Sequence, residues 1–357
     1  MNKLNLKGMK RQELVERLAG IGKERYRADQ IIRWLYLQRV RNIDEMSNLS
    51  RLCRKHLQDF SYIGQIELVK EELSQDGTRK FLFRLEDEHT IETVLIAEKS
   101  RLTLCISTQV GCRMGCRFCL TGRSGFERQL SAAEIVDQVI QVAEIVAPES
   151  QGRGAISNIV MMGMGEPLDN FTEVVKALEI LMYDDGLQFS NRRLTLSTCG
   201  LAPEIIELGK LTHVSLAISL NAADDTLRSE LMPVNRRYNL DELLAACRTY
   251  PATNQRRITF EYILFAGLND SLEDAGRLVE LVGNLPVKIN LIPFNEHPEL
   301  SFKRPDHQRI VDFVNFLQQH KLMVMTRRSK GADISAACGQ LRAAEAAVEA
   351  AQEPAIS

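Results

Sequence analysis

The sequence predicts an α/β protein in which a helical module and a small antiparallel sheet precede a mostly parallel sheet with covering helices. Three successive patterns along the chain predict this fold class. Residues 1–60 place apolar side chains three and four positions apart, and residues 64–98 change to a period of two. From residue 102 onward, short apolar runs alternate with helical patterns, as is typical of parallel strands joined by covering helices.

Residues 1–60 are expected to form the helical module. Gly20 and Gly22 separate its first two helices, because glycine often interrupts a helical pattern. Ser47 or Ser50 is expected to cap the third helix, since a serine hydroxyl accepts a hydrogen bond from the free amides of a first turn. The predicted helices lie in RQELVERLAG, YRADQIIRWLYLQ and SNLSRLCRKHL.

The charge of this module differs from that of the rest of the chain. Residues 1–60 contain 14 Lys and Arg against 7 Asp and Glu, a net charge of +7, whereas the whole chain of 357 residues carries −2. The remainder therefore carries −9. A basic module on an acidic body is typical of a local contact with nucleic acid, although a solvated helical surface would give the same count.

Residues 61–98 are expected to form a small antiparallel sheet that links the module to the rest of the chain. The segments QIELVKEEL, RKFLFRLED and TIETVLIAE alternate apolar and polar residues or run apolar, as strands do. The Asp-Gly pair in SQDGT predicts a hairpin turn between the first two strands.

Residues 99–342 are expected to form the mostly parallel sheet, and an Ala/Glu-rich tail follows at 343–357. Active sites of such folds lie at the carboxyl ends of the strands. Several strands here end in small or polar residues, which could face one central ligand. These ends are GMGEP, STCG, SLN and PFN; the candidate strands are LTLCIST, SNIVMMG, RRLTLST, HVSLAISL, RRITFEYIL, KINLIPF and LMVMTRR, and the helices include SAAEIVDQVIQVAEIV, FTEVVKALEILMY, LDELLAACRTY and LEDAGRLVELVG.

Three cysteines, Cys112, Cys116 and Cys119, lie within eight residues in the spacing C-x3-C-x2-C. Thiolates this close are typical of a metal site. A structural zinc site closes with four Cys or His ligands, usually in two pairs, and no fourth ligand with pair spacing lies nearby. An iron–sulfur cluster held by three thiolates would leave one iron open. We therefore expect one [4Fe–4S] cluster, with zinc as the alternative.

An open iron and the glycine-rich strand end GMGEP together point to S-adenosylmethionine (SAM) as a cofactor. The amino and carboxylate groups of SAM would fill the open iron, and electron transfer into its sulfonium would release a 5′-deoxyadenosyl radical. Gly163 and Gly165 permit close approach of the backbone, and Glu166 supplies a carboxylate for an ammonium group.

The chain is expected to work in the cytoplasm and to have no membrane partner. It contains no apolar run of 18 residues, and its N-terminus lacks the apolar stretch of a signal peptide. Eight cysteines, three of them spaced as metal ligands, are typical of a reducing compartment.

Six motifs in order, CRMGCRFCLTGRSGF, GMGEP, LTLSTCG, AISLNA, IPFN and AACGQL, closely resemble the radical-SAM RNA methyltransferases that act on carbon 2 of adenine, the RlmN type. The resemblance covers nearly the whole chain and implies a radical-SAM partial (β/α)6 barrel with N-terminal accessory domains. It implies two substrates, an adenosine in the peptidyl-transferase region of 23S rRNA and the adenosine 3′ of the anticodon in some tRNAs. It also implies an electron donor such as flavodoxin or ferredoxin.

The resemblance implies catalytic roles for three further residues. Cys338 matches the cysteine that a first SAM methylates; a second SAM supplies the radical that removes hydrogen from this methyl, and the resulting methylene adds to carbon 2. Cys105 matches the cysteine whose thiolate attacks the sulfur of Cys338, forms a disulfide bond and releases the methylated base. Glu92 matches a carboxylate assigned to proton transfer, although an alternating strand could also point it outward.

The resemblance also implies a set of residues that contact SAM. Asn221 stands where His is common, and Leu120 stands where Ala is common; both changes are mild and leave the cofactor prediction intact. Cys53, Cys199 and Cys247 match no functional position and are expected to pack in the core. The matched SAM positions are Gly165, Glu166, Ser197, Ser219, Leu220, Asn221 and Asn295.

Two other functions stay open from the sequence. One is the related carbon-8 rRNA methyltransferase, which uses the same thiols. The other is a non-catalytic iron–sulfur RNA-binding protein, which would need neither Cys105 nor Cys338.

Overall fold

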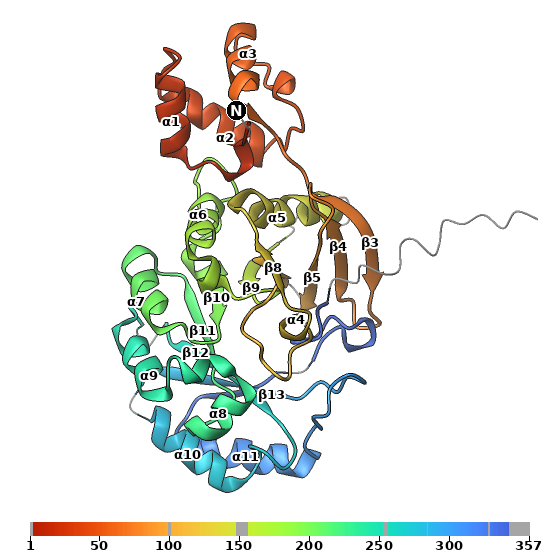
Figure 1. Cartoon of the computed structure of the whole chain (residues 1–357), viewed down its shortest axis with the longest axis vertical. Coiled ribbons are helices and arrows are strands. Elements are labelled where there is room, and N and C mark those ends of the chain that lie inside the picture. Colours follow the sequence, from red (N-terminus) through yellow and green to blue (C-terminus); the bar gives the residue numbers. More distant parts are fainter. Residues whose placement is uncertain are drawn as a thin grey trace, which may run out of the picture.

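The computed structural model describes residues 3–98, 101–147, 156–252, 256–283, 285–327 and 329–342. Its helical module stands at one end of the molecule, above a body built on one large sheet (Figure 1). The predicted tail at 343–357 lies outside the described residues.

The helical module contains three α-helices, as the sequence predicts: α1 (Arg11–Ala19), α2 (Tyr26–Tyr36) and α3 (Arg51–Phe60). The hydroxyl of Ser50 accepts a hydrogen bond from the amide of Cys53 and caps α3, which decides between the two predicted caps. Two short strands tie the ends of the module together, because β1 (Leu4–Asn5) pairs in parallel with β2 (Ser61–Tyr62).

Three antiparallel strands follow the module: β3 (Glu67–Leu73), β4 (Arg79–Arg84) and β5 (Thr90–Glu98). The antiparallel pairing and the hairpin turn at residues 74–78 are confirmed. These strands do not form a sheet of their own, because β5 also pairs antiparallel with β6 (Arg101–Cys105). They therefore extend the main sheet, and the division of the chain at residue 98 is not a break in that sheet.

Within the described residues, the main sheet contains ten strands and runs from β14 at one edge to β3 at the other. Its parallel part is an arc of seven strands, which is the open arrangement expected of a partial barrel. The parallel strands after β6 are β9 (Asn158–Met161), β10 (Leu194–Thr198), β11 (Ser215–Ser219), β12 (Ile258–Leu264), β13 (Val287–Pro293) and β14 (Val324–Thr326).

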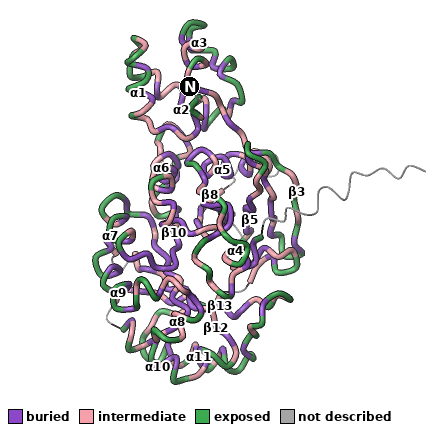
Figure 2. Tube along the Cα trace, in the orientation of Figure 1, coloured by how far each residue is buried: buried purple, intermediate pink, exposed green. Residues whose placement is uncertain are grey.

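Helices connect these strands and cover the outside of the sheet (Figure 1). The strands in the middle are largely buried, whereas the helices expose their outer faces (Figure 2). Among the described helices, none is long and apolar enough to cross a membrane. The covering helices are α5 (Ala132–Val146), α6 (Phe171–Leu181), α7 (Ala202–Leu211), α8 (Asp225–Leu231), α9 (Leu240–Thr249), α10 (Leu272–Val282) and α11 (His307–Gln319).

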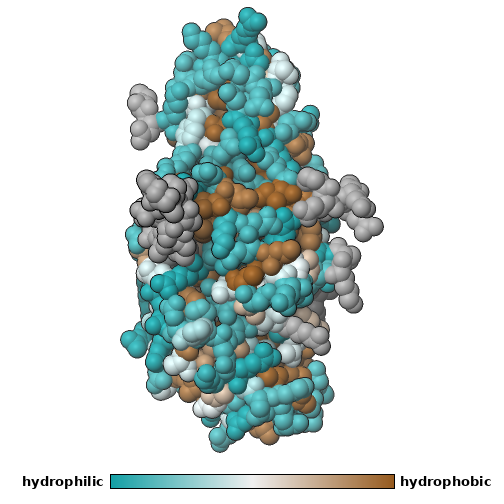
Figure 3. All heavy atoms as spheres, turned by 90° about the vertical axis from the view of Figure 1, so that its right-hand side faces the viewer, coloured by the Kyte–Doolittle hydropathy of each residue, from teal (hydrophilic) through white to brown (hydrophobic). Residues whose placement is uncertain are grey.

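One edge of the sheet is formed by β3, which exposes the charged side chains of Glu67, Lys70 and Glu71 and the apolar side chains of Leu68 and Leu73. Figure 3 shows this side of the molecule, where hydrophilic residues cover most of the surface and apolar bands interrupt them. Charged side chains on an edge strand hinder pairing with a strand of another chain.

Candidate active site

The three closely spaced cysteines lie in a loop whose base is a small hairpin that the sequence reading did not predict. Strand β7 (Gln109–Gly111) precedes the loop and pairs with β8 (Phe126–Gln129), while α4 (Leu120–Arg123) follows the last cysteine. Gly111 has a φ of +74°, and a Cβ there would lie 2.1 Å from the carbonyl oxygen of Gly125. Only glycine therefore allows the base of the loop to close.

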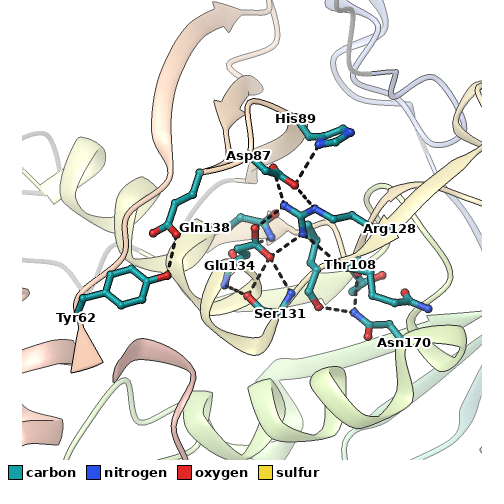
Figure 4. Close-up of polar contacts among 12 residues, drawn as sticks. Tyr62, Asp87, His89, Thr108, Arg128, Ser131, Glu134, Gln138 and Asn170 are labelled. Carbon is teal, nitrogen blue, oxygen red and sulfur yellow. Dashed lines mark hydrogen bonds and ion pairs between the residues drawn. The ribbon is translucent and has the colours of Figure 1, made fainter. Parts of the chain in front are cut away.

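A polar network fixes this base to its surroundings (Figure 4). The guanidinium of Arg128 on β8 donates to Asp87, in the turn between β4 and β5, at 2.9 Å and to Glu134 on α5 at 2.7 Å. This ion pair lowers the pKa of Asp87 to about 2. The amide of Asn170 donates to the carbonyl of Thr108 at 2.8 Å, just before β7. Three separate elements thus hold the cysteine loop in one position.

The three cysteines line one cavity together with the carboxyl ends of the parallel strands. This is the edge at which the sequence predicts a central ligand. The cavity brings together most of the predicted cofactor residues and the thiol of Cys338 from the far end of the chain. Of the predicted residues, those lining it are Cys112, Cys116, Cys119, Gly163, Gly165, Glu166, Ser197, Ser219, Asn221 and Cys338.

The chemistry of this donor set fits an iron–sulfur cluster. Burial raises the pKa of Cys112 to about 12 and also raises the pKa values of Cys116 and Cys119. Such thiols are protonated at neutral pH, and a bound cluster would supply the positive charge that stabilises them as thiolates. Within the described parts of the chain, no three His, Cys, Asp or Glu side chains are placed to hold a single metal ion, whereas a four-iron cluster takes each thiolate on a different iron.

The strand end after β9 carries Gly165 and Glu166. Gly165 has a φ of +99°, and a Cβ there would lie 2.5 Å from the Cβ of Gln109, so the glycine is required by packing against the β7 segment. The carboxylate of Glu166 accepts hydrogen bonds from the amides of Cys199 at 2.8 Å and Leu168 at 3.0 Å. Burial raises its pKa. Backbone amides thus orient the carboxylate that is predicted from the sequence to bind an ammonium group.

The remaining predicted SAM residues divide into two groups. Ser197 and Asn221 line the cavity; the Ser197 hydroxyl donates to Glu261 at 3.1 Å, and the Asn221 side chain accepts from the amide of Ile263 at 2.9 Å. Leu220 is fully buried and is not among the lining residues. Asn295 lies in the adjoining cavity, where its side chain accepts a hydrogen bond from Ser329.

That adjoining cavity contains the two thiols for which the resemblance implies catalytic roles. Cys105, at the end of β6, lines it together with Cys338, and Cys338 therefore faces both cavities. Burial raises the pKa of Cys105 to about 12. The loop that carries Cys338 is bound beside the cysteine loop, because the amide of Leu120 donates to the carbonyl of Gly339 at 2.8 Å.

Glu92 lies on β5 and is only 5% exposed, so the alternative of an outward-facing strand residue is wrong. Its carboxylate forms an ion pair with Lys80 at 3.2 Å and accepts a hydrogen bond from the amide of Arg342 at 2.7 Å. Burial raises its pKa. Glu92 lines neither cavity and instead contacts the end of the segment that carries Cys338.

Sequence reasoning missed two charged residues of the site and the position of one cysteine. Arg228 on α8 is fully buried and donates to the carbonyls of Cys199 at 2.7 Å and Leu220 at 3.0 Å, which fixes two strand ends. Glu261 on β12 lines the first cavity. Cys199 packs in the core as expected but also lines the cavity. Nothing in the sequence distinguishes Arg228, the one arginine of α8, from the exposed Arg236 and Arg237 that follow it.

Comparison with known proteins gives the class of this site. Residues 106–279 match the model of the Radical SAM superfamily, and residues 4–63 match that of the ribosomal RNA large subunit methyltransferase N-terminal domain. The crystal structure of a radical SAM methyltransferase from Sphaerobacter thermophilus is 44% identical, covers 96% of this chain and 100% of its own, and superposes with a TM-score of 0.88. The fold and site are thus those of a radical SAM enzyme.

Curated relatives narrow the class to a family. The dual-specificity RNA methyltransferase RlmN of Geotalea uraniireducens is 51% identical over 342 residues, which are 96% of this chain and 97% of that protein. The protein of the same name from Pelobacter propionicus is 49% identical over 353 residues, 99% of each chain. The chain belongs to the RlmN family of dual-specificity RNA methyltransferases. Membership of the radical SAM superfamily implies SAM and a [4Fe–4S] cluster as cofactors.

Proposed function

We propose that this protein methylates carbon 2 of an adenosine in the peptidyl-transferase region of 23S rRNA and of the adenosine 3′ of the anticodon in some tRNAs. The observation that carries the proposal is the position of Cys338, which faces the three-cysteine cavity on one side and Cys105 on the other. A thiol in this position can receive a methyl group in one cavity and meet a second thiol in the next.

Cys112, Cys116 and Cys119 would hold the cluster, and the polar strand ends would hold SAM. When bound, these cofactors supply a methyl group and a radical that removes hydrogen from a methyl group. The protein orients them and excludes water, since the cavity walls come from buried strand ends. The residues proposed to contact SAM are Gly165, Glu166, Ser197, Ser219, Leu220, Asn221 and Asn295.

The two outer thiols would divide the remaining work. Cys338 would carry the methyl group to carbon 2, and the Cys105 thiolate would attack the sulfur of Cys338. An S–S bond then forms, the bond between that sulfur and the methylene carbon breaks, and the carbon takes up a proton as the methylated base leaves. Because burial holds Cys105 as a thiol, its attack requires loss of a proton. Glu92 is proposed to take part in proton transfer, since its carboxyl is buried and burial raises its pKa, which favours the protonated form that can donate a proton.

The proposal also covers the RNA-binding part of the protein, its electron donor and its location in the cell. The basic module at residues 1–60 is proposed to bind RNA phosphates, which carry the opposite charge. An electron donor such as flavodoxin or ferredoxin would reduce the cluster, and the cytoplasm is the proposed location.

Nucleoside mass spectrometry tests the proposal directly. The protein is reconstituted anaerobically with iron and sulfide, supplied with SAM, a chemical reductant and either a 23S rRNA fragment or tRNA, and the RNA is digested to nucleosides. We expect 2-methyladenosine from the wild type and none from Cys338→Ala. Formation of 8-methyladenosine would favour the carbon-8 enzyme, and RNA binding without any methylated base would favour a non-catalytic protein.

A further inference from the structure

The turn between β3 and β4, residues 74–78, contacts the segment that leads to Cys338. The hydroxyl of Ser74 donates to one carboxylate oxygen of Asp333 at 2.6 Å, and the amide of Gln75 donates to the other at 3.1 Å. These hydrogen bonds lower the pKa of Asp333, so the carboxylate is ionised at neutral pH. One side chain of the C-terminal segment is thus bound by two adjacent donors of the turn.

A second carboxylate makes the reverse contact, from the turn to the segment. Asp76 accepts the amide of Gly331 at 3.0 Å through one oxygen and the amide of Thr78 at 3.0 Å through the other. Although burial opposes ionisation, hydrogen bonds from Thr78 and Gly331 hold the pKa of Asp76 at about 2. Gly331 has a φ of +65°, and a Cβ there would lie 2.8 Å from the Cβ of Ala336, so the contact allows no larger residue.

The segment is bound again beyond Cys338. Its end is held by the amide of Arg342, which donates to Glu92 on β5 at 2.7 Å, and by the carbonyl of Leu341, which accepts from the hydroxyl of Thr121 at 2.7 Å. Cys338 therefore lies between two points of attachment, and strands of the antiparallel part supply a residue at each: the β3–β4 turn before it and β5 after it.

We propose that Asp76 and Asp333 are positioning residues, which anchor the Cys338 segment on the β3–β4 turn and thereby hold its thiol between the two cavities. This inference rests on the proposed function. Reacting groups that are held in the correct geometry react faster than groups that must first diffuse into it. A displacement of a reacting group by about 1 Å can lower the rate about 100-fold. The antiparallel strands are suited to this support, because they share one continuous sheet with the strands that line the site.

The test compares Ser74→Ala, Asp333→Ala and their double variant with Gln75→Ala. Gln75 is the matched control, because its side chain is exposed and only its backbone amide contacts Asp333. Hydrogen exchange read by mass spectrometry should show residues 331–338 exchanging about tenfold faster in Asp333→Ala than in the control. The thermal midpoint should stay within about 3 °C of the wild type, since only one local attachment is lost.

Kinetics separate positioning from a general structural effect. We expect kcat to fall about tenfold in Asp333→Ala and by less in Ser74→Ala, which leaves the Gln75 amide as a donor, with the KM for RNA unchanged in both. The double variant should match Asp333→Ala, because both changes act on the same attachment. Asp76→Ala should also make the amides of residues 331–338 exchange faster than in the control. The cluster absorbance should match the wild type in every variant.

Equal exchange of residues 331–338 in Asp333→Ala and Gln75→Ala would overturn the inference, and so would an unchanged kcat with faster exchange. Failure of the proposed function is distinguishable, because it would appear as absence of methylated adenosine from the wild-type protein itself. The exchange comparison would then still report whether the turn holds the segment.

Discussion

Cys338 and Cys105 are the two residues whose contrasting positions bear most directly on the chemistry. Cys338 is half-buried and faces two cavities, whereas Cys105 is buried at the end of β6 and faces one. The contrast predicts different defects for the two thiols. In Cys338→Ala, no methyl group should load on the protein and no RNA should be modified.

Cys105→Ala should instead trap the RNA. The proposed mechanism still allows the methyl group to load on Cys338 and its methylene to add to carbon 2. Among the described residues that line the cavity shared by Cys338 and Cys105, no other thiol remains to break the resulting bond. We expect a covalent RNA–protein adduct that migrates slowly on a denaturing gel, with Cys338→Ala as the control that gives none. Multiple turnovers by Cys105→Ala, with free methylated RNA, would rule out the proposed role of this thiol.

The pKa of Cys105 gives a second prediction at the residue scale. Because burial raises it to about 12, only a small fraction is thiolate at pH 8, and the thiolate is the form that reacts with iodoacetamide. The rate at which Cys105 is alkylated in the native protein should rise about tenfold per pH unit from pH 8 to pH 10. Over the same range, the alkylation rate of an ordinary thiol with a pKa of about 8.5 levels off. Peptide mass spectrometry measures it, and a plateau near pH 9 would contradict the burial of this thiol.

At the scale of elements, the β7–β8 hairpin decides whether the cysteine loop can close. Gly111→Ala would place a Cβ 2.1 Å from the carbonyl oxygen of Gly125. We expect a loss of about 2 kcal/mol or more in the free energy of unfolding and a much lower iron content after reconstitution. Chemical denaturation and iron analysis measure the two effects.

Gly125→Ala is the matched control for this prediction. Gly125 lies in the same hairpin with a φ of +87°, but a Cβ there would meet nothing within 4 Å. Its replacement should cost only the backbone strain of about 1 kcal/mol and should leave iron binding intact. Equal iron loss in both variants would mean that backbone conformation, and not closure of the loop base, controls cluster binding.

The whole molecule joins a basic helical module to the acidic body that carries the site. Lys7, in the short segment before α1, forms a fully buried ion pair with Asp137 on α5, so the module is fixed on the body. Removal of one partner from such a pair leaves an unpaired buried charge, which is strongly destabilising. The orientation of the module toward the site is therefore set by a specific contact.

This arrangement predicts a salt-dependent RNA contact. Arg51 and Lys55 are exposed on one face of α3. Replacing both with Gln should weaken RNA binding and reduce the slope of log affinity against log salt by about 1 to 2, because fewer phosphate contacts release fewer counterions. Fluorescence anisotropy at several salt concentrations measures it. Lys210→Gln on α7 is the control, and an equal effect there would show that the module has no special role.

Much of this molecule could be predicted from the sequence, because local patterns fix local structure. The change from helical to strand periodicity located the three helices of the module, the antiparallel strands and the parallel strands. Parallel strands align their carboxyl ends, so Gly165, Ser197 and Ser219 were expected at one edge, where they line one cavity with Cys112 and its neighbours.

Only the tertiary structure decided which distant groups meet. Asp76 and Gly331 are 255 positions apart, and no periodicity relates the hairpin turn to the Cys338 segment. The inward position of Glu92 and the burial of Arg228 likewise depend on partners supplied by other elements. Successive side chains of a strand point to opposite faces of the sheet, and the sequence shows this alternation. Which face is buried, and which residues cover it, depends on how the strands join into one sheet and how the N-terminal and C-terminal segments pack against it.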